Sequence, residues 1–202
     1  MDSVSLRYAR VSQNVKYTLA LSGRKDESVK IVGVTKALPF QVAVVAVQNG
    51  IFDLGESRVQ EASEKIPAAE RFLVDQNVDI SKLTWHMIGR LQSNKAAKAA
   101  RLFDVIHSVD SLKLARILSR ASAEEGKILR VFVEVNSSNE TQKGGIAMDL
   151  VTDYASKIIE LENLYVEGLM TIGLKSQDEG VIRQSFISLR EMNDQISQGY
   201  SK

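Results

Sequence analysis

The sequence predicts an α/β fold built as a (β/α)8 barrel of the TIM type. Short β-branched or apolar runs alternate with helical runs six times along the 202 residues, which is the pattern of parallel strands joined by right-handed crossovers. The predicted strands end about 27 residues apart on average, close to the repeat of such barrels. No GxGxxG motif follows the first strand, so the fingerprint of a dinucleotide-binding sheet is missing.

The chain begins with a helix and then alternates. Apolar residues from Tyr8 to Leu19 recur at spacings of three and four, which predicts an amphipathic helix over residues 5–22. The predicted strands are 31–36, 51–57, 85–90, 105–110, 130–136 and 164–172. The predicted helices that follow them are 39–49, 59–65, 93–102, 111–125, 148–160 and 179–197. Ser93 and Ser111 precede two of these helices and are predicted to cap their first N–H groups.

No shift in composition divides the chain, so we expect a single domain over residues 1–202. Six strands are two fewer than the barrel needs, and two more units would take about 50 residues. A six-stranded sheet would leave two parallel edges unpaired. We therefore expect these residues to be a C-terminally incomplete form of a longer protein, lacking the last two β/α units.

Composition excludes several classes of function. The net charge of +1, from 26 Lys plus Arg against 25 Asp plus Glu, gives no general attraction for nucleic acids or anionic membranes. The chain has no cysteine, and its two histidines are too few and too far apart for a metal cluster. No window reaches the roughly 18 apolar residues of a membrane span, and the N-terminus lacks the apolar core of a signal peptide. We expect a soluble, cytoplasmic protein without a metal.

Three polar features have a structural interpretation. The cations of residues 90–101 and Lys113 are best interpreted as a solvated helix face, with nucleic-acid binding as a minor alternative. His107 lies inside a predicted strand and is interpreted as structural. Lys143, Gly144 and the following glycine form either a loop or an anion-binding nest, and two glycines alone do not decide between them.

Residues at the carboxyl ends of barrel strands are candidates for chemistry. Lys36 ends the first strand, where it is either a solvated lysine at the rim or a desolvated amine that attacks an aldehyde. His86 follows the only tryptophan, and it is either a hydrogen-bonded core histidine or a residue flanking a bound ring. Position alone leaves both questions open.

Five segments in order resemble the YggS/PROSC family of pyridoxal 5′-phosphate (PLP) homeostasis proteins. They are VTKALP (34–39), DLGESRVQEASEKI (53–66), WHMIGRLQSNKAAKAARLFDVIHSVDSLKLARIL (85–118), VFVEVNSSNETQKGGI (131–146) and VEGLMTIG (166–173). The resemblance implies a PLP-binding barrel like the N-terminal domain of alanine racemase.

The resemblance also implies a cofactor site. Lys36 takes the place of the lysine that holds PLP as a Schiff base, which favours the desolvated amine. The residues implied to bind the cofactor are Lys36, Ser57, His86, Asn136, Met170 and Thr171. Many relatives have Asn in place of Ser57. Relatives also continue into a phosphate-binding segment and an arginine near the pyridine nitrogen, which this sequence lacks. We therefore expect the intact protein to bind PLP and these 202 residues to bind it weakly or not at all.

The resemblance implies a non-catalytic protein of PLP, vitamin B6 and amino-acid homeostasis, with PLP-dependent apoenzymes as candidate recipients. A racemase of this fold type needs a base on each face of the cofactor, and this chain has no room for the domain that supplies the second base. A weak PLP-dependent enzyme such as an amino-acid racemase is the alternative. A monomer is expected, because the barrel is closed in full-length relatives.

Overall fold

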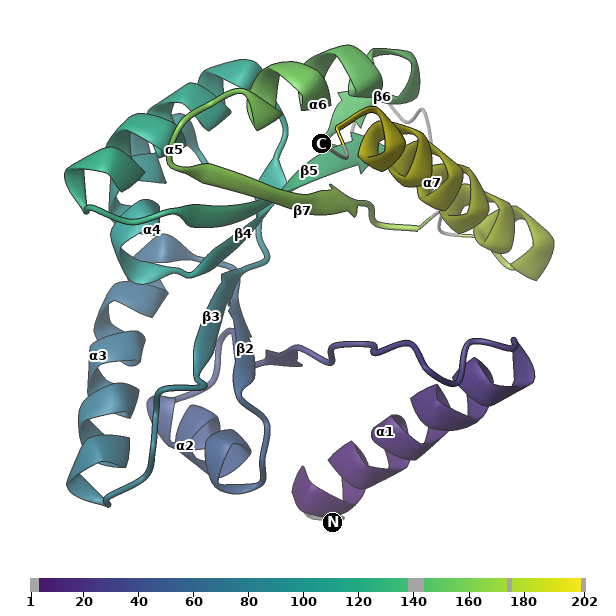
Figure 1. Ribbon diagram of the computed structural model, residues 1–202. Coiled ribbons are helices and arrows are strands. Elements are labelled where there is room, and N and C mark those ends of the chain that lie inside the picture. Colours follow the sequence, from purple (N-terminus) through teal and green to yellow (C-terminus); the bar gives the residue numbers. More distant parts are fainter. Residues whose placement is uncertain (1–3, 138–143, 174–175, 201–202) are drawn as a thin grey trace. The chain divides into compact units, whose positions relative to one another are not determined.

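The computed structural model describes residues 4–137, 144–173 and 176–200 (Figure 1). The contacts within the chain group it into two compact units, Met1–His86 and Met87–Lys202. The expectation of a single domain therefore stays a prediction.

Unit 1 alternates helices with short strands. Its elements are α1 (Val4–Leu21), β1 (Gly33–Val34), α2 (Phe40–Gln48), β2 (Asp53–Glu56), α3 (Val59–Asp75) and β3 (Thr84–Met87), whose last residue begins the second unit. Strands β1 and β2 are parallel, with Gly33 opposite Leu54 and Val34 opposite Gly55. Parallel pairing brings the carboxyl ends of both strands to one edge.

Helix α3 carries the apolar stripe that closes the core of unit 1. Its buried residues recur at helical spacing and are Val59, Ala62, Lys65, Ile66, Ala69 and Leu73. The rings of Phe40 and Phe72 join α2 to α3, with centroids 6.0 Å apart. The helix was predicted to end at residue 65, but it continues through Pro67 because the apolar stripe extends beyond that residue.

Unit 2 repeats the alternation around longer strands. Its elements are η1 (Ser93–Lys95), α4 (Ala96–Leu102), β4 (Val105–Val109), α5 (Leu112–Glu124), β5 (Leu129–Asn136), β6 (Ile146–Ala147), η2 (Met148–Leu150), α6 (Val151–Ile159), β7 (Leu164–Met170) and α7 (Glu179–Tyr200). Strand β5 pairs in parallel with β4, β6 and β7.

One side of β5 forms the core of unit 2. Alternate residues of this strand are buried, namely Leu129, Val131, Val133 and Val135. Helices α4, α5 and α6 lie along the sheet, and α7 lies beside β7 (Figure 1). The intervening side chains, from Arg130 to Asn136, therefore line the opposite face of the strand. This face carries Arg130, Phe132, Glu134 and Asn136, and Glu134 is buried there.

The six predicted strands and seven predicted helices all have counterparts, which confirms the α/β class and the parallel pairing. The two-residue strand β6 was not predicted, because so short a run has no detectable period. Ser111 caps α5 as predicted, accepting a hydrogen bond from the Leu114 N–H at 3.3 Å. The cap predicted at Ser93 was wrong. A 3-10 turn starts there, and the caps of η1 and α4 are Gln92 and Lys95, without side-chain cap bonds.

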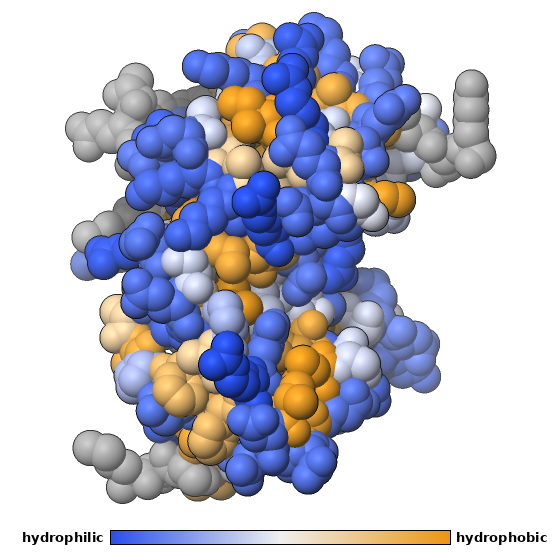
Figure 2. Space-filling model, turned by 90° about the vertical axis from the view of Figure 1, so that its left-hand side faces the viewer, coloured by the Kyte–Doolittle hydropathy of each residue, from blue (hydrophilic) through white to orange (hydrophobic). Residues whose placement is uncertain are grey.

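Hydrophilic residues cover most of the face shown in Figure 2, and the hydrophobic residues lie between them in separate groups. Within the described part of the chain, no helix combines the length and the apolar character that crossing a membrane requires.

Candidate functional site

Lys36 lies in a tight turn just beyond the end of β1. The Leu38 N–H donates to the Thr35 carbonyl at 3.1 Å, which closes the turn around Lys36 and Ala37. Ala37 has a positive φ of 59°. Lys36 is exposed, as are Val34, Ala37 and Leu38. Lys36 here is thus the solvated lysine of the first interpretation and not the desolvated amine that the resemblance favours.

A buried ionic network lies directly beneath this turn. The Lys65 Nζ donates to the Thr35 carbonyl at 2.8 Å, to Glu56 Oε1 at 2.8 Å and to Glu61 Oε1 at 2.9 Å. Glu56 is fully buried, and its Oε1 also accepts from the Thr35 hydroxyl at 2.7 Å. Glu61 Oε1 accepts from the Ala37 N–H at 2.7 Å. We call Thr35, Glu56, Glu61 and Lys65 the Lys65 network.

The charge of Glu61 is matched to this setting. The hydrogen bond from Lys65 holds the pKa of Glu61 below its ordinary value, with the Ala37 N–H acting in the same direction and partial burial opposing both. The carboxylate is therefore ionised when it bridges the ammonium to the turn.

Ser57 lies at the same strand edge as Lys36. The β1–β2 register pairs Val34 with Gly55, and the Thr35 N–H donates to the Gly55 carbonyl at 3.0 Å. The next residues, Thr35 and Glu56, are joined through their side chains. Lys36 and Ser57 follow them at the carboxyl ends of neighbouring strands, and Ser57 is half-buried. Unit 1 thus places an exposed amine and a hydroxyl-bearing residue at one edge.

His86 is buried and hydrogen-bonded. Its Nε2 lies 3.0 Å from Asp53 Oδ1, and the Lys30 Nζ lies 2.9 Å from the same oxygen. Burial would raise the pKa of Asp53, but the hydrogen bonds from Lys30 and His86 outweigh it, so that pKa lies below its ordinary value. This is the setting that the core-histidine interpretation expected for His86.

The three remaining candidates, Asn136, Met170 and Thr171, lie at one strand edge of unit 2. Glu134 of β5 is opposite Met170 of β7. The Thr171 hydroxyl donates to the Val135 carbonyl at 2.8 Å and lies 2.8 Å from the Ser137 hydroxyl. Asn136, Met170 and Thr171 are all half-buried.

Gly145 brings the chain close to this edge. Its φ is +105°, and a Cβ at this position would lie 2.7 Å from the backbone nitrogen of Asn136. Strand β6 then pairs with Val135 and Asn136. The sequence suggested a loop or an anion nest at Lys143 and the two glycines after it. Lys143 lies outside the described residues, and Gly145 allows its backbone to lie against the backbone of Val135 and Asn136.

Glu134 is a buried carboxyl on the polar face of β5. Burial raises its pKa, the charge of Asp110 adds to this effect, and Arg90 opposes it. Arg90 itself lies 3.8 Å from Asp110 and is largely exposed. One step along the same face, the ring of Phe132 stacks on His107 with centroids 4.8 Å apart, which agrees with a structural role for that histidine.

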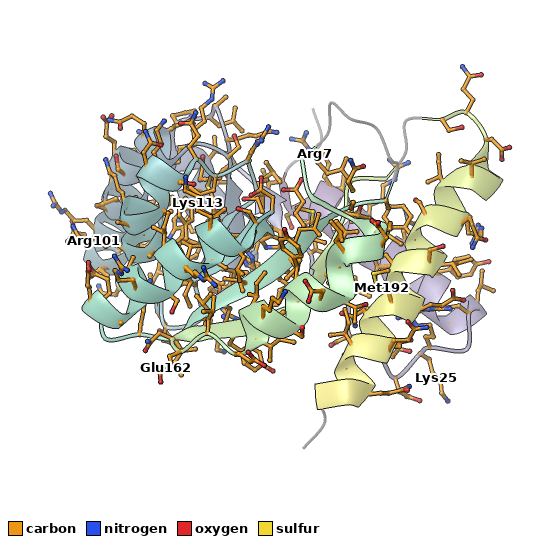
Figure 3. All side chains as sticks on the ribbon, turned by 90° about the horizontal axis from the view of Figure 1, so that it is seen from above. Arg7, Lys25, Arg101, Lys113, Glu162 and Met192 are labelled. Carbon is orange, nitrogen blue, oxygen red and sulfur yellow. The ribbon has the colours of Figure 1, made fainter. Side chains whose placement is uncertain are left out.

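The cations between residues 90 and 101 behave as a solvated helix face. One side of α4 is buried and consists of alanines, while Lys95, Lys98 and Arg101 are exposed. Arg101 points outward in Figure 3, and its Nε donates to Glu125 at 2.6 Å. The described residues contain no group of three or more His, Cys, Asp or Glu that could hold a metal ion.

Comparison with known proteins decides the family. A model described as the alanine racemase N-terminal domain matches residues 6–202. The pyridoxal phosphate homeostasis protein of Pasteurella multocida (strain Pm70) is 31% identical over 196 residues, which make up 97% of this chain and 81% of that protein. The chain belongs to the pyridoxal phosphate homeostasis protein family. The resemblance drawn from the five sequence segments is thereby confirmed.

Solved structures of similar proteins agree with this family and its fold. An unknown protein from Bifidobacterium adolescentis is 32% identical with a TM-score of 0.89, over 99% of this chain and 83% of that one. PipY from Synechococcus elongatus PCC7942, solved with PLP bound, is 28% identical with a TM-score of 0.71, over 89% of this chain and 81% of PipY. The α/β fold of the alanine racemase N-terminal type is thus confirmed.

The six candidate residues of this family member fall into two groups. The structure brings Lys36 and Ser57 to one strand edge, with His86 in the same unit, and it gathers Asn136, Met170 and Thr171 at a strand edge of unit 2. Sequence reasoning missed the Lys65 network. Lys65 occupies the apolar stripe of α3 between Ala62 and Ile66, and a charged residue in such a position was the signal that could have revealed it.

Proposed function

We propose that this chain binds PLP covalently but weakly through the Nζ of Lys36 and acts as a PLP carrier in the cytoplasm rather than as an enzyme. PLP would supply an aldehyde, with which a lysine amine condenses with loss of water. Membership of the pyridoxal phosphate homeostasis family supports this proposal. The PLP-bound structure of PipY, a similar protein, supports it as well.

One observation carries the proposal: Lys36 presents an exposed amine from a turn whose backbone is fixed on both sides. Thr35 on one side is hydrogen-bonded to Glu56 and Lys65, and Ala37 on the other side is hydrogen-bonded to Glu61. An exposed side chain is accessible to a cofactor from solution, and a fixed backbone gives it a defined starting point. Ser57 at the same edge adds a hydroxyl that can contact the cofactor.

The remaining candidate residues fit a supporting role. Thr171 and Asn136 offer a hydroxyl and an amide at a strand edge of unit 2, where Gly145 leaves the backbone closely packed. We include Met170 for apolar contact with a ring, and His86, held by Asp53, for a contact at the end of β3. These assignments rest on the matching of sequence segments to the family.

The proposal of a carrier rather than an enzyme rests on the proton chemistry available in unit 1. Racemisation needs a base on each face of the cofactor. His86 is buried and bonded to Asp53, and Lys65 is buried and bonded to two carboxylates, so the proposal assigns the second base to neither. Match to the alanine racemase N-terminal domain favours the alternative, a weak racemase. Loss of an α-deuteron from an amino acid, dependent on added PLP, would identify that alternative.

Trapping of the bound cofactor tests the proposal. The protein is incubated with PLP, reduced with borohydride and digested, and the modified peptide is identified by mass spectrometry. We expect the pyridoxyl group on the peptide that contains Lys36, and loss of labelling in Lys36→Met. Lys25→Met, which removes another exposed lysine of unit 1, is the matched control and should label normally. Equal labelling of wild type and Lys36→Met would contradict the assignment.

We further propose that PLP-dependent apoenzymes receive the cofactor and that the carrier is a monomer. Transfer is measured by mixing the PLP-loaded protein with an apoenzyme and following recovery of the apoenzyme's activity against free PLP at the same concentration. Recovery no faster than that with an equal amount of free PLP would contradict transfer by the carrier. Light scattering at several concentrations measures the mass, and a mass of two chains would contradict the monomer.

A further inference from the structure

We propose that Lys65 is a positioning residue for Lys36, acting through Glu56 and Glu61 to hold the backbone of the turn that presents the amine. This inference rests on the proposed function of Lys36. The hydrogen bonds of the Lys65 Nζ go to Thr35, Glu56 and Glu61, so Lys65 acts on Lys36 through these residues.

The burial of Lys65 is the first step of the argument. Its side chain is 5% exposed, and that of Glu56 is 0% exposed. Charges are taken out of water at a cost, and such groups persist where ion pairing and hydrogen bonds compensate. All three hydrogen bonds of the Lys65 ammonium are accounted for by Thr35, Glu56 and Glu61. The ammonium is therefore committed to this network.

The positions of the contacts are the second step. The network bonds to the residue before Lys36 through the Thr35 carbonyl and hydroxyl. It bonds to the residue after Lys36 through the Ala37 N–H. The backbone is thus held on both sides of Lys36, while the Lys36 side chain remains exposed. Such a pattern fixes where the side chain starts without occupying its amine.

The strain at Ala37 is the third step. A non-glycine residue in the left-handed region is strained, and Ala37 has a φ of 59°. Its N–H donates to Glu61 Oε1 at 2.7 Å, and Lys65 holds that same oxygen at 2.9 Å. The network therefore stabilises a turn conformation that alanine does not favour by itself.

A held turn has a consequence for binding. Ordering the backbone of a residue costs conformational entropy, and a turn that is already ordered avoids this cost when the cofactor binds. Removal of the network should therefore weaken the attachment of PLP at Lys36 even though Lys36 itself is unchanged.

The test uses variants at Glu61, because Glu61 is the partly exposed member of the ion pairs and its loss should leave the fold intact. Glu61→Ala removes the acceptor for the Ala37 N–H. Glu61→Gln keeps an oxygen that can accept this bond. Asp153→Ala is the matched control, because it removes the carboxylate of another i,i+4 lysine pair, on α6, where both side chains are exposed. Fluorescence of Trp85, the only tryptophan, monitors folding of unit 1.

Two readouts are measured on each variant. The first is amide hydrogen exchange at Ala37 without PLP, which we expect to be about tenfold faster in Glu61→Ala. The second is the dissociation constant of PLP, from the visible absorbance of lysine-bound PLP, which we expect to rise about tenfold. Glu61→Gln should restore both toward wild type, and Asp153→Ala should change neither. Lys65→Met, where it folds, should change both at least as much as Glu61→Ala.

Three results would overturn the inference. Unchanged exchange at Ala37 in Glu61→Ala would show that the network does not hold the turn. Faster exchange with unchanged PLP affinity would show that the held turn does not matter for binding. A wild-type protein that attaches no PLP at Lys36 would overturn the proposed function and this role of Lys65 with it. The exchange experiment, made without PLP, separates this last failure from the first.

Discussion

The two strand edges that carry the candidate residues are stabilised by different chemistry. In unit 1, the turn at Lys36 rests on one buried ammonium and two carboxylates. In unit 2, the edge at Asn136 rests on hydroxyl bonds to backbone and on the close approach of Gly145. Loss of one member of a buried ion pair leaves the other charge uncompensated, whereas loss of a neutral hydrogen bond costs much less. The edge of unit 1 should therefore respond more strongly to mutation and to pH.

Lys65→Met should have the largest effect. It removes the only cation of the Lys65 network and leaves the fully buried Glu56 without its ionic partner. We expect a loss of about 3 to 5 kcal/mol in the free energy of unfolding, measured by urea titration with Trp85 fluorescence. Lys157→Met, which breaks an exposed pair with Asp153, should cost less than about 0.5 kcal/mol. Similar losses in the two variants would contradict the importance given to burial.

Gly145→Ala tests how tightly the backbone is packed at the edge of unit 2, where no ion pair is involved in the contact. A Cβ would meet the Asn136 nitrogen at 2.7 Å, and the φ of +105° disfavours alanine. The steric contact and the unfavourable φ together should lower the free energy of unfolding by about 2 to 3 kcal/mol. Gly126→Ala is the control, because its φ of +63° is also left-handed but a Cβ there meets nothing within 4 Å. That variant should cost about 1 kcal/mol, and a loss as small in Gly145→Ala would show that the backbone yields.

A pair of matched threonine substitutions compares the two edges directly. Thr35→Val removes a hydroxyl that donates to the buried Glu56, and Thr171→Val removes one that donates to the Val135 carbonyl. Hydrogen bonds to charged groups contribute about 1.5 to 3 kcal/mol, and those between neutral groups about 1 kcal/mol. Thr35→Val should accordingly cost more in urea unfolding. The reverse order would contradict the comparison between ionic and neutral edges.

The dependence of stability on pH should be a smaller effect than these substitutions. It should have opposite signs in the two units. The pKa of Glu61 is lowered by Lys65, so the stability it supplies is present above the ordinary glutamate pKa and is lost as pH falls through the lowered value. The pKa of Glu134 is raised by burial, so its contribution is present at low pH and is lost as pH rises through the raised value.

Two glutamine variants separate these contributions. Glu134→Gln should raise the urea midpoint at neutral pH and lose this advantage well below the ordinary glutamate pKa of about 4.3, where the carboxyl is protonated in both the folded and the unfolded state. Glu61→Gln should instead weaken the decline of stability in acid. The urea midpoint is measured at intervals of pH for each variant and for wild type. If both variants changed the urea midpoint at neutral pH in the same direction, the assigned pKa directions would be contradicted.

Much of the fold could be predicted because its elements have clear periodic patterns. Strand β4 was placed within one residue, and helix α5 has the serine cap that its sequence indicates. Prediction failed where tertiary packing overrides a local signal. Helix α3 continues through Pro67 because its buried stripe does, and β6 consists of two residues that form a strand only by pairing with β5.

The candidate site was predictable in part. The order of the five segments identified the family, and the predicted strands placed Lys36 and Ser57 at strand ends, where the structure has them. Position alone left the exposure of Lys36 open as one of two alternatives, because it depends on the turn at Ala37 and not on the apolar strand before it. The Lys65 network was hidden because it joins residues 21 and 30 positions apart.

A crystal structure of the protein soaked with PLP would test the central claim most directly. The account predicts continuous electron density between the Lys36 Nζ and the cofactor, with the bonds of Thr35 and Ala37 to the Lys65 network unchanged from those described. PLP attached to a different lysine, or bound at Lys36 with this network broken, would contradict it.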